Sequence, residues 1–258
     1  MTVLSFIPAP GANRLSRMVA AHARMEVLLL ARNGEQLLLA LGIPLLLLVG
    51  GAKSGTVVDL GSGRRIDVLT PGVLALAVMS TAFTSLAIAT AFERRYGVLK
   101  RLGASPLPRE GLLLAKIAAL LCIETVQLGV ISAAGLALGW HPHGGFATVA
   151  SCLVLVVTGT AAFASLGLFL AGTLRAEATL AAANLVYVLL LVVGAVVVPL
   201  ASYPESLQPA VSVLPSAALA EGLRDVCSGA GLESWRVAAL VGWAVLAGTL
   251  TTRTFRWE

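Results

Sequence analysis

Charged residues are scarce in this sequence. Asp, Glu, Lys and Arg make up 12% of its 258 residues, whereas apolar residues make up 58%. An average soluble domain carries about 25% charged and about 45–50% apolar residues, so water is not the main solvent of this chain. Aromatic residues reach only 5%, and none alternate with cations as they do in a nucleic-acid-binding surface. We therefore expect a membrane protein with no nucleic-acid partner.

The residue patterns of metal sites, disulfide frameworks and nucleotide sites are also missing. The three cysteines, Cys122, Cys152 and Cys227, are odd in number and form no CxxC motif. The two histidines of 141–143 have no third ligand at a useful spacing. The stretch LVGGAKSG at 48–55 has alanine where a phosphate loop needs glycine before the lysine. We expect no catalytic residue, no bound metal and no ATP site in this chain.

Long apolar runs are what the sequence has instead. About 20 apolar residues in a helix cross a hydrocarbon layer of about 30 Å. Because lipid offers no hydrogen bonds, the backbone of such runs must be helical. We predict an all-α integral membrane protein, a single transmembrane domain over 1–258, in which Pro44 interrupts the short first span. The six predicted spans cover 37–52, 68–92, 117–140, 146–173, 178–201 and 235–251.

The cations predict the orientation of these spans. Most of the eighteen lysines and arginines lie in segments that face the cytoplasm if both termini are inside, so we predict a multi-pass protein of the plasma membrane with cytoplasmic termini. Residues 13–32 ahead of the first span form a predicted amphipathic helix. Its basic and apolar faces suit a helix that lies in the membrane interface.

The most charged part of the chain is the loop 93–110 between the second and third spans. Residues 96–102 predict a short amphipathic helix, which the glycine and prolines of 103–108 end. Cations alone would keep this loop inside, but topology does not require an ordered helix closed by two prolines. The pattern therefore favours a rigid docking surface for a cytoplasmic partner.

Polar residues inside the spans are the second group of candidates. Glu124 and Gln127 are three residues apart on one helical face, and a carboxylate at this depth is costly unless it is paired or hydrated. Such groups either join helices by hydrogen bonds or line a path for a substrate. The predicted substrate path has six polar residues: Thr81, Ser85, Glu124, Gln127, Asn184 and Tyr187.

Several stretches resemble one protein family. ERRYGVLKRLGASPLPREGLLLAK at 93–116, TPGVLALAVMS at 70–80, LPSAALAEGLRDVCSG at 214–229 and the terminal FRWE are similar to the ABC-2 type transport permeases. These are membrane subunits of ATP-driven exporters, and six spans with an N-terminal interfacial helix fit them. The resemblance implies that two permeases, as a homodimer or heterodimer, sit on two ATP-binding subunits, which bind the ATP and Mg.

The resemblance also assigns roles to particular residues. The family's first cytoplasmic loop carries a coupling helix that docks on the ATPase, and its outer segment, here 202–233, contains short re-entrant helices. The family often has an acidic residue where Arg95 stands here, so no ion pair is carried over for that position. The residues implied for coupling to the ATPase are Glu93, Arg94, Tyr96, Gly97, Leu99, Lys100, Arg101, Leu102 and Ser105.

Together these observations predict an exporter permease whose cargo is amphipathic or hydrophobic: a drug-like compound, a lipid or a glycan-lipid. Two other functions remain open. A secondary transporter or channel would use Glu124 as a proton or ion site and would need no ATPase. A membrane scaffold would bind partners and move no cargo.

Overall fold

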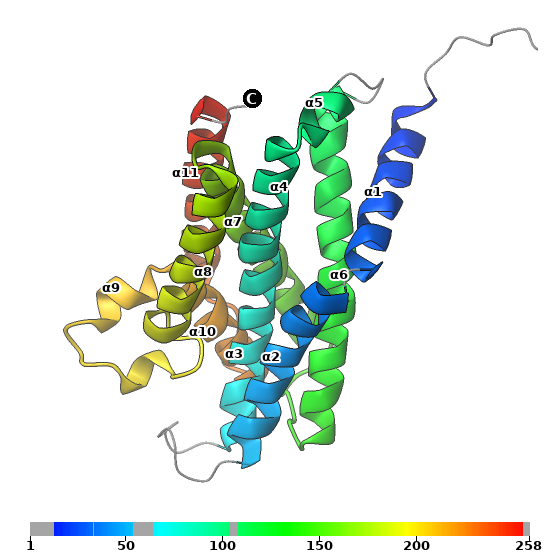
Figure 1. Ribbon diagram of the computed structural model, residues 1–258. Helices are drawn as coiled ribbons and strands as arrows, with labels where there is room; N and C mark the ends of the chain where they lie inside the picture. The colour runs from blue at the N-terminus through cyan, green and yellow to red at the C-terminus, as the bar shows by residue number, and fades with distance from the viewer. Residues whose placement is uncertain (1–12, 33, 54–63, 104–107, 255–258) are drawn as a thin grey trace, which may run out of the picture.

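The computed structural model describes residues 13–32, 34–53, 64–103 and 108–254. These segments are almost entirely helical, and no strand occurs in them (Figure 1). The chain is an all-α integral membrane protein. Its helices are α1 (Leu15–Arg32), α2 (Gly34–Lys53), α3 (Arg65–Met79), the π-helix η1 (Ser80–Ser85), α4 (Leu86–Arg95), α5 (Val98–Gly103), α6 (Arg109–Ala137), α7 (Phe146–Thr173), α8 (Ala176–Val193), the 3₁₀-helix η2 (Leu200–Ser202), α9 (Gln208–Ser212), α10 (Pro215–Ser228) and α11 (Ser234–Thr254).

Within the described ranges, five helical segments are long and apolar enough to cross a membrane. They are Arg65–Arg95, Leu114–Ala137, Phe146–Thr173, Ala176–Val193 and Ser234–Thr254. They correspond to the last five predicted spans, with ends that differ by several residues.

The first predicted span, 37–52, lies in α2, which has 20 residues. At about 1.5 Å per residue α2 measures about 30 Å, close to the thickness of the hydrocarbon layer. Pro44, inside α2, removes one backbone donor from the helix.

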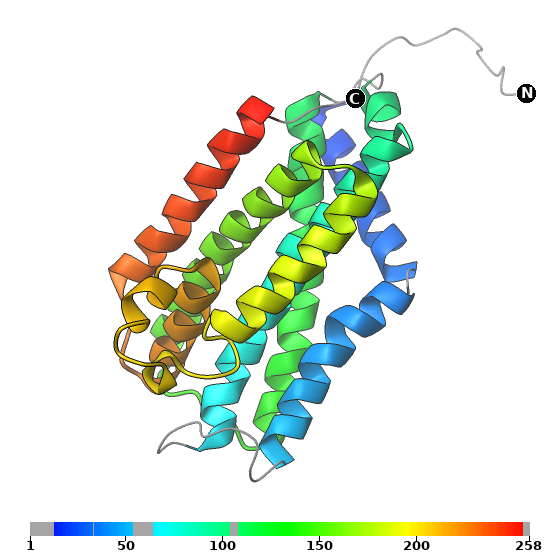
Figure 2. The same ribbon diagram turned by 60° about the vertical axis from the view of Figure 1, so that its left-hand side comes forward.

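Helix α3 forms the centre of the bundle. Its side chains are buried from Leu69 to Met79, and it packs against α2, α6, α7 and α10. Helices α8 and α11 lie at the periphery, α8 along α4 and α11 along α7 (Figure 2). The helices expose large apolar side chains on the outside of the bundle, as expected for contact with lipid.

The second span is not a uniform α-helix. Its middle residues, Ser80–Ser85, form one π-helical segment between α3 and α4. Helix α7 approaches this segment closely at Gly167, where a Cβ atom would come within 2.8 Å of the Phe83 carbonyl oxygen. Glycine is therefore required for this contact, and π-helical turns are frequent at functional sites.

Helix α8 ends at Val193, well before the predicted end of the fifth span at 201. A Cβ atom at Gly194 would collide with Ser216 of α10, and Ala195 adopts a left-handed φ of 52°. The backbone carbonyls of residues 195 and 196 accept hydrogen bonds from Arg224 of α10. The helix can end here because Arg224 of α10 donates to backbone carbonyls that a longer α8 would have bonded internally.

The bundle has two distinct ends. Helix α5, the start of α1 and the end of α11 lie at one end, called the α5 end below (Figure 1). The predicted outer segment, 202–233, contains α9 and α10 and lies toward the opposite end, called the α10 end. Helix α1 packs along α6 on the α5 side of the bundle. The predicted helix at 13–32 thus occurs as α1 and packs on the span that contains α6. That it lies in the membrane interface stays a prediction.

Candidate functional site

A sharp turn separates the second span from the short helix of the charged loop. Helix α4 ends at Arg95, and Gly97 has a φ of +67°, which favours glycine. Tyr96, in the turn, stacks on Phe92 with ring centroids 6.0 Å apart. The guanidinium of Arg95 lies 5.8 Å from the centre of the Tyr96 ring, on its face. The turn is therefore ordered by aromatic contacts as well as by its glycine.

Helix α5 (Val98–Gly103) follows this turn and presents Lys100 and Arg101 to solvent, with Leu102 half-buried; Tyr96, in the turn before it, is also exposed. The predicted helix at 96–102 thus occurs, starting two residues later. Of the residues implied for coupling, Ser105 and the side chain of Leu99 lie outside the described residues.

The base of α5 is tied to two other helices through a buried group of ionisable side chains. Lys116 of α6 donates to Glu93 of α4 at 2.6 Å and to Glu26 of α1 at 3.0 Å. His22 of α1 lies 3.5 Å from the Glu26 carboxylate. We call His22, Glu26, Glu93 and Lys116 the α5-end cluster. Three of its members come from segments far apart in the chain, so it joins α1, α4 and α6.

The α5-end cluster is poorly hydrated and incompletely satisfied. The side chains of Lys116, Glu26 and Glu93 are 11%, 14% and 20% exposed. Among the described residues, Glu93 Oε2 and His22 Nε2 are buried without a hydrogen-bond partner. One ammonium faces two carboxylates, so the cluster carries one excess negative charge when His22 is neutral. Because these charges are buried, a small movement of one helix would change the electrostatic energy of the cluster.

The residues after Glu93 tie α4 to two further neighbours, the end of α7 and the start of α8. The Arg94 guanidinium donates to the backbone carbonyl of Leu174, where α7 ends. Arg95 forms an ion pair with Glu177 in the first turn of α8. Three consecutive side chains of α4 therefore connect it to its neighbours at the α5 end. Glu93 contacts α6 and, through Lys116, α1, whereas Arg94 and Arg95 contact the end of α7 and the start of α8.

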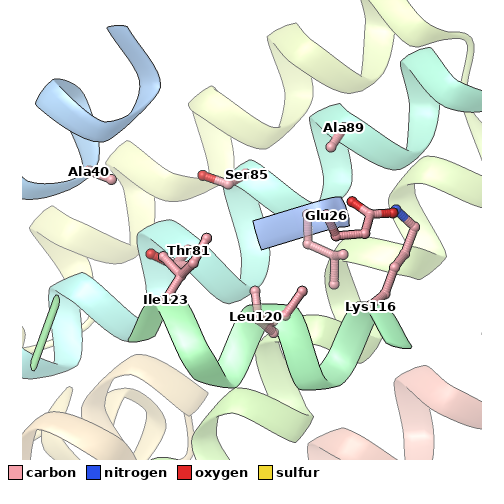
Figure 3. A pocket seen from close by; sticks show the side chains of 10 residues that line it. Glu26, Ala40, Thr81, Ser85, Ala89, Lys116, Leu120 and Ile123 are labelled. Atoms are coloured by element: carbon pink, nitrogen blue, oxygen red, sulfur yellow. The ribbon is translucent and has the colours of Figure 1, made fainter. Parts of the chain in front are cut away.

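A small cavity of about 60 Å³ lies beneath the α5-end cluster. Figure 3 shows Glu26 and Lys116 close together at one side of it, with Ser85 and Thr81 along its wall. Its other lining residues come from α2, α4 and α6: Ala40, Leu86, Ala89, Ala119, Leu120 and Ile123. A volume of this size holds a few water molecules when polar partners are available. Two of the predicted path residues, Thr81 and Ser85, thus lie in the same cavity wall as the charged pair.

Gln127 connects three helical segments in the middle of the bundle. Its Oε1 accepts a hydrogen bond of 2.7 Å from Thr81, and its Nε2 donates to the carbonyl of Ala40 at 2.6 Å. Gln127 is 2% exposed, so both hydrogen bonds lie in a low-dielectric environment. The predicted path residues Thr81 and Gln127 are brought into direct contact, as a joint between α6, η1 and α2.

Glu124 points toward a different neighbour from Gln127, although both lie on the same helix. Its Oε2 accepts a 2.7 Å hydrogen bond from Thr160 of α7, and the residue is 1% exposed. Its other oxygen, Oε1, is buried with no hydrogen-bond partner among the described residues. Such a carboxyl group is costly to ionise in this position.

The remaining predicted path residues lie on α8. Asn184 is exposed on the outer surface of α8, apart from the other polar residues. Tyr187 is half-buried, and its hydroxyl interacts with the Ser80 side chain at the start of η1. The six predicted residues therefore form no single line, and five of them converge on η1 and α6.

Two larger apolar cavities follow the seam between α6 and α7. One of about 380 Å³ contains Glu124 and Trp140 and reaches α10. The other, of about 270 Å³, contains Lys116 and Thr160 and lies toward the α5 end. Leu121 and Val157 line both cavities, which are therefore adjacent, with the Glu124–Thr160 hydrogen bond beside them, and we call the pair the apolar groove. Sequence reasoning missed Lys116, Glu26 and Thr160, whose spacing along the chain carries no sign of contact.

Arg224 organises the α10 end. It is 8% exposed and donates to the carbonyls of Val68 at 3.1 Å and Ala195 at 2.7 Å, and to that of Val196. It also pairs with Glu221 at 2.5 Å. Burial lowers the pKa of the Arg224 guanidinium from its ordinary value, while Glu221 acts in the opposite direction. The arginine therefore links α10 to α3 and to the segment after α8.

A comparison with family models identifies the chain. Residues 62–253 of the 258 match the model described as "ABC-2 family transporter protein". The match includes α3 to α10 and nearly all of α11, and hence the turn, α5 and most of the ionic contacts described above. No curated protein sequence matched the chain. Members of the matched family are transmembrane permease subunits of ABC transporters that associate with an ABC ATP-binding subunit. The chain belongs to the ABC-2 family of transporter proteins.

Proposed function

We propose that this permease subunit exports an amphipathic or hydrophobic cargo, driven by ATP hydrolysis on a separate subunit. In this proposal two permeases, identical or different, work with two ATP-binding subunits in the plasma membrane. The α5 end and both termini face the cytoplasm, where the partner subunits bind ATP and Mg. In this proposal the ATPase site belongs to the partner subunit, and we expect no catalytic residue, metal or cofactor in the permease chain itself.

The observation that carries the proposal is the arrangement at the base of α5. A cytoplasmic ATPase moves a permease only through contacts that differ between its two states. Helix α5 presents Lys100 and Arg101 to solvent, and its base is joined through Glu93, Arg94 and Arg95 to four other helices. A displacement of α5 would therefore be transmitted to most of the bundle through the hydrogen bonds and ion pairs of these three side chains.

The route from α5 into the membrane passes through α4 and η1. Closure of two ATP-binding subunits would move α5, and α4 would transmit this displacement to the π-helical segment. Thr81 of η1 holds Gln127 of α6, and Gly167 of α7 lies against the same segment. A shift of η1 thus changes the relative position of α6 and α7, which form the walls of the apolar groove. We propose that this movement changes access to the cargo path.

The character of the groove supports the choice of cargo. Its walls are predominantly apolar side chains, with Glu124 and Thr160 where the two cavities meet, Lys116 toward the α5 end and a few hydroxyl groups elsewhere. Binding sites of about 300–1,000 Å³ with a few placed polar groups suit molecules that are mainly apolar. Drug-like compounds, lipids and glycan-lipids share this property.

The test is purification from native membranes through a C-terminal tag, in mild detergent, followed by mass spectrometry and ATPase assay. We expect a stoichiometric subunit with a phosphate loop. The double charge reversal K100E/R101E is expected to lower its recovery at least tenfold, because the basic surface of α5 is replaced by an acidic one. The matched control is R17E/R24E, which reverses two exposed cations of α1. Equal recovery of the ATPase with both double variants would contradict a coupling role for α5.

Glu124 gives one alternative a specific basis. A buried carboxyl with an unpaired oxygen is typical of a proton site, which a secondary transporter would use. Such a transporter would be purified without an ATPase, and its activity in proteoliposomes would follow a pH gradient and be lost in E124Q. Transport that requires ATP and persists in E124Q would exclude this alternative.

A further inference from the structure

Two of the three cysteines meet in space although they are far apart in the chain. Cys152 lies near the start of α7, and Cys227 lies near the end of α10. Their sulfur atoms are 3.9 Å apart, with Cys227 buried and Cys152 half-buried. The third cysteine, Cys122, is exposed on α6. Sequence spacing alone offered no reason to pair any of them.

The backbones of α7 and α10 are held together along the seam that contains these cysteines. A Cβ atom at Gly159 of α7 would lie 2.9 Å from the Leu219 side chain of α10, and one at Gly222 of α10 would lie 3.0 Å from Leu155 of α7. Positions 152, 155 and 159 share one face of α7, and 219, 222 and 227 follow in the reverse order on α10. The two cysteines thus form the third contact layer of a seam whose first two layers each pair a glycine with a leucine.

The position of the sulfur atoms suits a covalent bond. A disulfide has a sulfur–sulfur distance of about 2.05 Å, so each sulfur would have to move by about 1 Å, which side-chain rotation supplies. The seam already holds the two backbones close, and the backbone N–H of His143 donates to the carbonyl of Cys227 at 2.8 Å. Closing the bond therefore needs little movement of either helix.

We propose that Cys152 and Cys227 form an intramolecular disulfide that joins α10 to α7 at the outer side of the membrane. The proposal rests on the orientation proposed above, which places the α10 end outside the cell, where disulfides persist. Both thiols line the cavity of about 380 Å³ between α6, α7 and α10, so a small reagent can reach them.

The oxidant is an external disulfide, either of a small molecule or of a thiol oxidoreductase. The less buried thiol, Cys152, loses its proton and attacks this disulfide, which gives a mixed disulfide and releases one external thiolate. The Cys227 thiolate then attacks the Cys152 sulfur, forms the internal bond and releases the second external thiolate. The two cysteines are oxidised by two electrons in total, the external disulfide is reduced to two thiols, and the two protons pass to those thiols.

The bond would fix the wall of the cavity at the α10 end. Helix α10 carries Arg224, which holds the segment after α8, so joining α10 to α7 also fixes that segment relative to α7. Movement that opens the groove would then occur on the α6 side, where Glu124 and Leu121 lie. With the disulfide formed, α7 and α10 would be the fixed wall of the cavity and α6 the moving wall.

The test uses the full-length protein in native membranes, alkylated with N-ethylmaleimide before and during lysis. Peptide mass spectrometry without reductant is expected to find a Cys152–Cys227 linked peptide and an alkylated Cys122. Reductant should release both cysteines and lower the Tm by roughly 5 °C, since the bond closes a long loop. The control C122S should show the same linkage and shift, whereas C152S and C227S should show neither.

Alkylation of all three cysteines in the native membrane protein would overturn the proposal. A separate reporter distinguishes a failure of the orientation. S228C in a variant with no other cysteine places one thiol at the exposed end of α10, and a membrane-impermeant maleimide should label it from outside. If the linkage is absent and S228C is labelled only in opened membranes, the orientation fails together with the disulfide. If the linkage is absent and S228C is labelled from outside, the disulfide alone is wrong.

Discussion

The two ends of the bundle both contain buried charge, and they satisfy it with different partners. At the α10 end, Arg224 donates to three backbone carbonyls and to Glu221. At the α5 end, Lys116 contacts two carboxylates, and Glu93 and His22 each keep one buried atom without a partner among the described residues. Arg224 is thus bound mainly to backbone, although Ser216 Oγ and Arg236 Nη1 at the same end are buried without a hydrogen-bond partner among the described residues. The α5-end cluster consists of side chains alone, with one lysine between two carboxylates.

This difference has a mechanical meaning. Backbone carbonyls cannot move without moving their helices, so the contacts of Arg224 fix α3, α10 and the segment after α8 in one arrangement. Ion pairs between long side chains can exchange partners at little cost in backbone movement. The α10 end is therefore suited to hold the bundle, and the α5 end is suited to change when a partner moves α5. The following predictions test that division, from the largest effect to the smallest.

Replacement of Arg224 by alanine is expected to have the largest effect on folding. It leaves Glu221 as a buried carboxylate without its cation and removes donors from the carbonyls of residues 68, 195 and 196. Losing one partner of a buried pair costs about 3–5 kcal/mol, which should lower the Tm in detergent by roughly 10 °C. R224K keeps the charge without the planar fork and should fall between the two proteins. A Tm within 2 °C of the parent, a margin of roughly 1 kcal/mol, would show that the α10 end does not depend on this arginine.

Replacement of Lys116 by methionine tests the α5-end cluster. It leaves the Glu26 and Glu93 carboxylates close together without a cation, and we expect a loss of about 2–3 kcal/mol. The rate of ATP-dependent transport by the folded protein should fall at least tenfold, because the contact between α1, α4 and α6 is lost. Thermal unfolding and transport in proteoliposomes measure the two effects.

The control for Lys116 uses the excess charge of the cluster. E93Q removes one carboxylate and leaves the pair of Lys116 with Glu26, so it should be milder than K116M. The double variant K116M/E93Q should recover part of the lost stability, because only one carboxylate then remains. A double-mutant cycle gives the interaction free energy of Lys116 with Glu93. Additive effects of the two substitutions would mean that the ion pair contributes nothing.

Gly167→Ala tests whether the two ends communicate through the π-helical segment. The new methyl group meets the Phe83 carbonyl oxygen at 2.8 Å, so α7 and η1 must separate. We expect a loss of about 1–3 kcal/mol and a several-fold fall in transport with the ATPase still bound. Gly129→Ala is the matched control, since a Cβ atom there meets no neighbouring atom within 4 Å. Equal transport by the two variants would exclude η1 from the route.

Loss of the Arg95–Glu177 pair should have the smallest effect. The side chains are 49% and 62% exposed, and exposed pairs contribute about 0–1 kcal/mol. R95Q is expected to shift the Tm by less than about 2 °C and to change ATPase recovery less than twofold. A larger loss in R95Q than in K116M would mean that α4 depends more on its contact with α8 than on its contact with α6.

The sequence by itself was enough for the membrane class, for the positions of five long apolar helices and for the short helix in the charged loop. These features depend on local composition: apolar run length, cation position, and the glycine and prolines at 103–108. The charged loop itself was located for the same reason, whereas the coupling role of Glu93, Arg94, Lys100 and Arg101 came from the family resemblance and stays a prediction.

Only the tertiary structure decided which distant residues meet. Lys116 reaches Glu26 across 90 positions, Thr160 reaches Glu124, and Cys152 reaches Cys227, and no local pattern encodes these pairs. The early end of α8 has the same origin, because Arg224 supplies from α10 the hydrogen bonds that a longer helix would have made internally. Helix formation follows from solvent and local sequence, whereas the pairing of charges and thiols follows from how the finished helices pack.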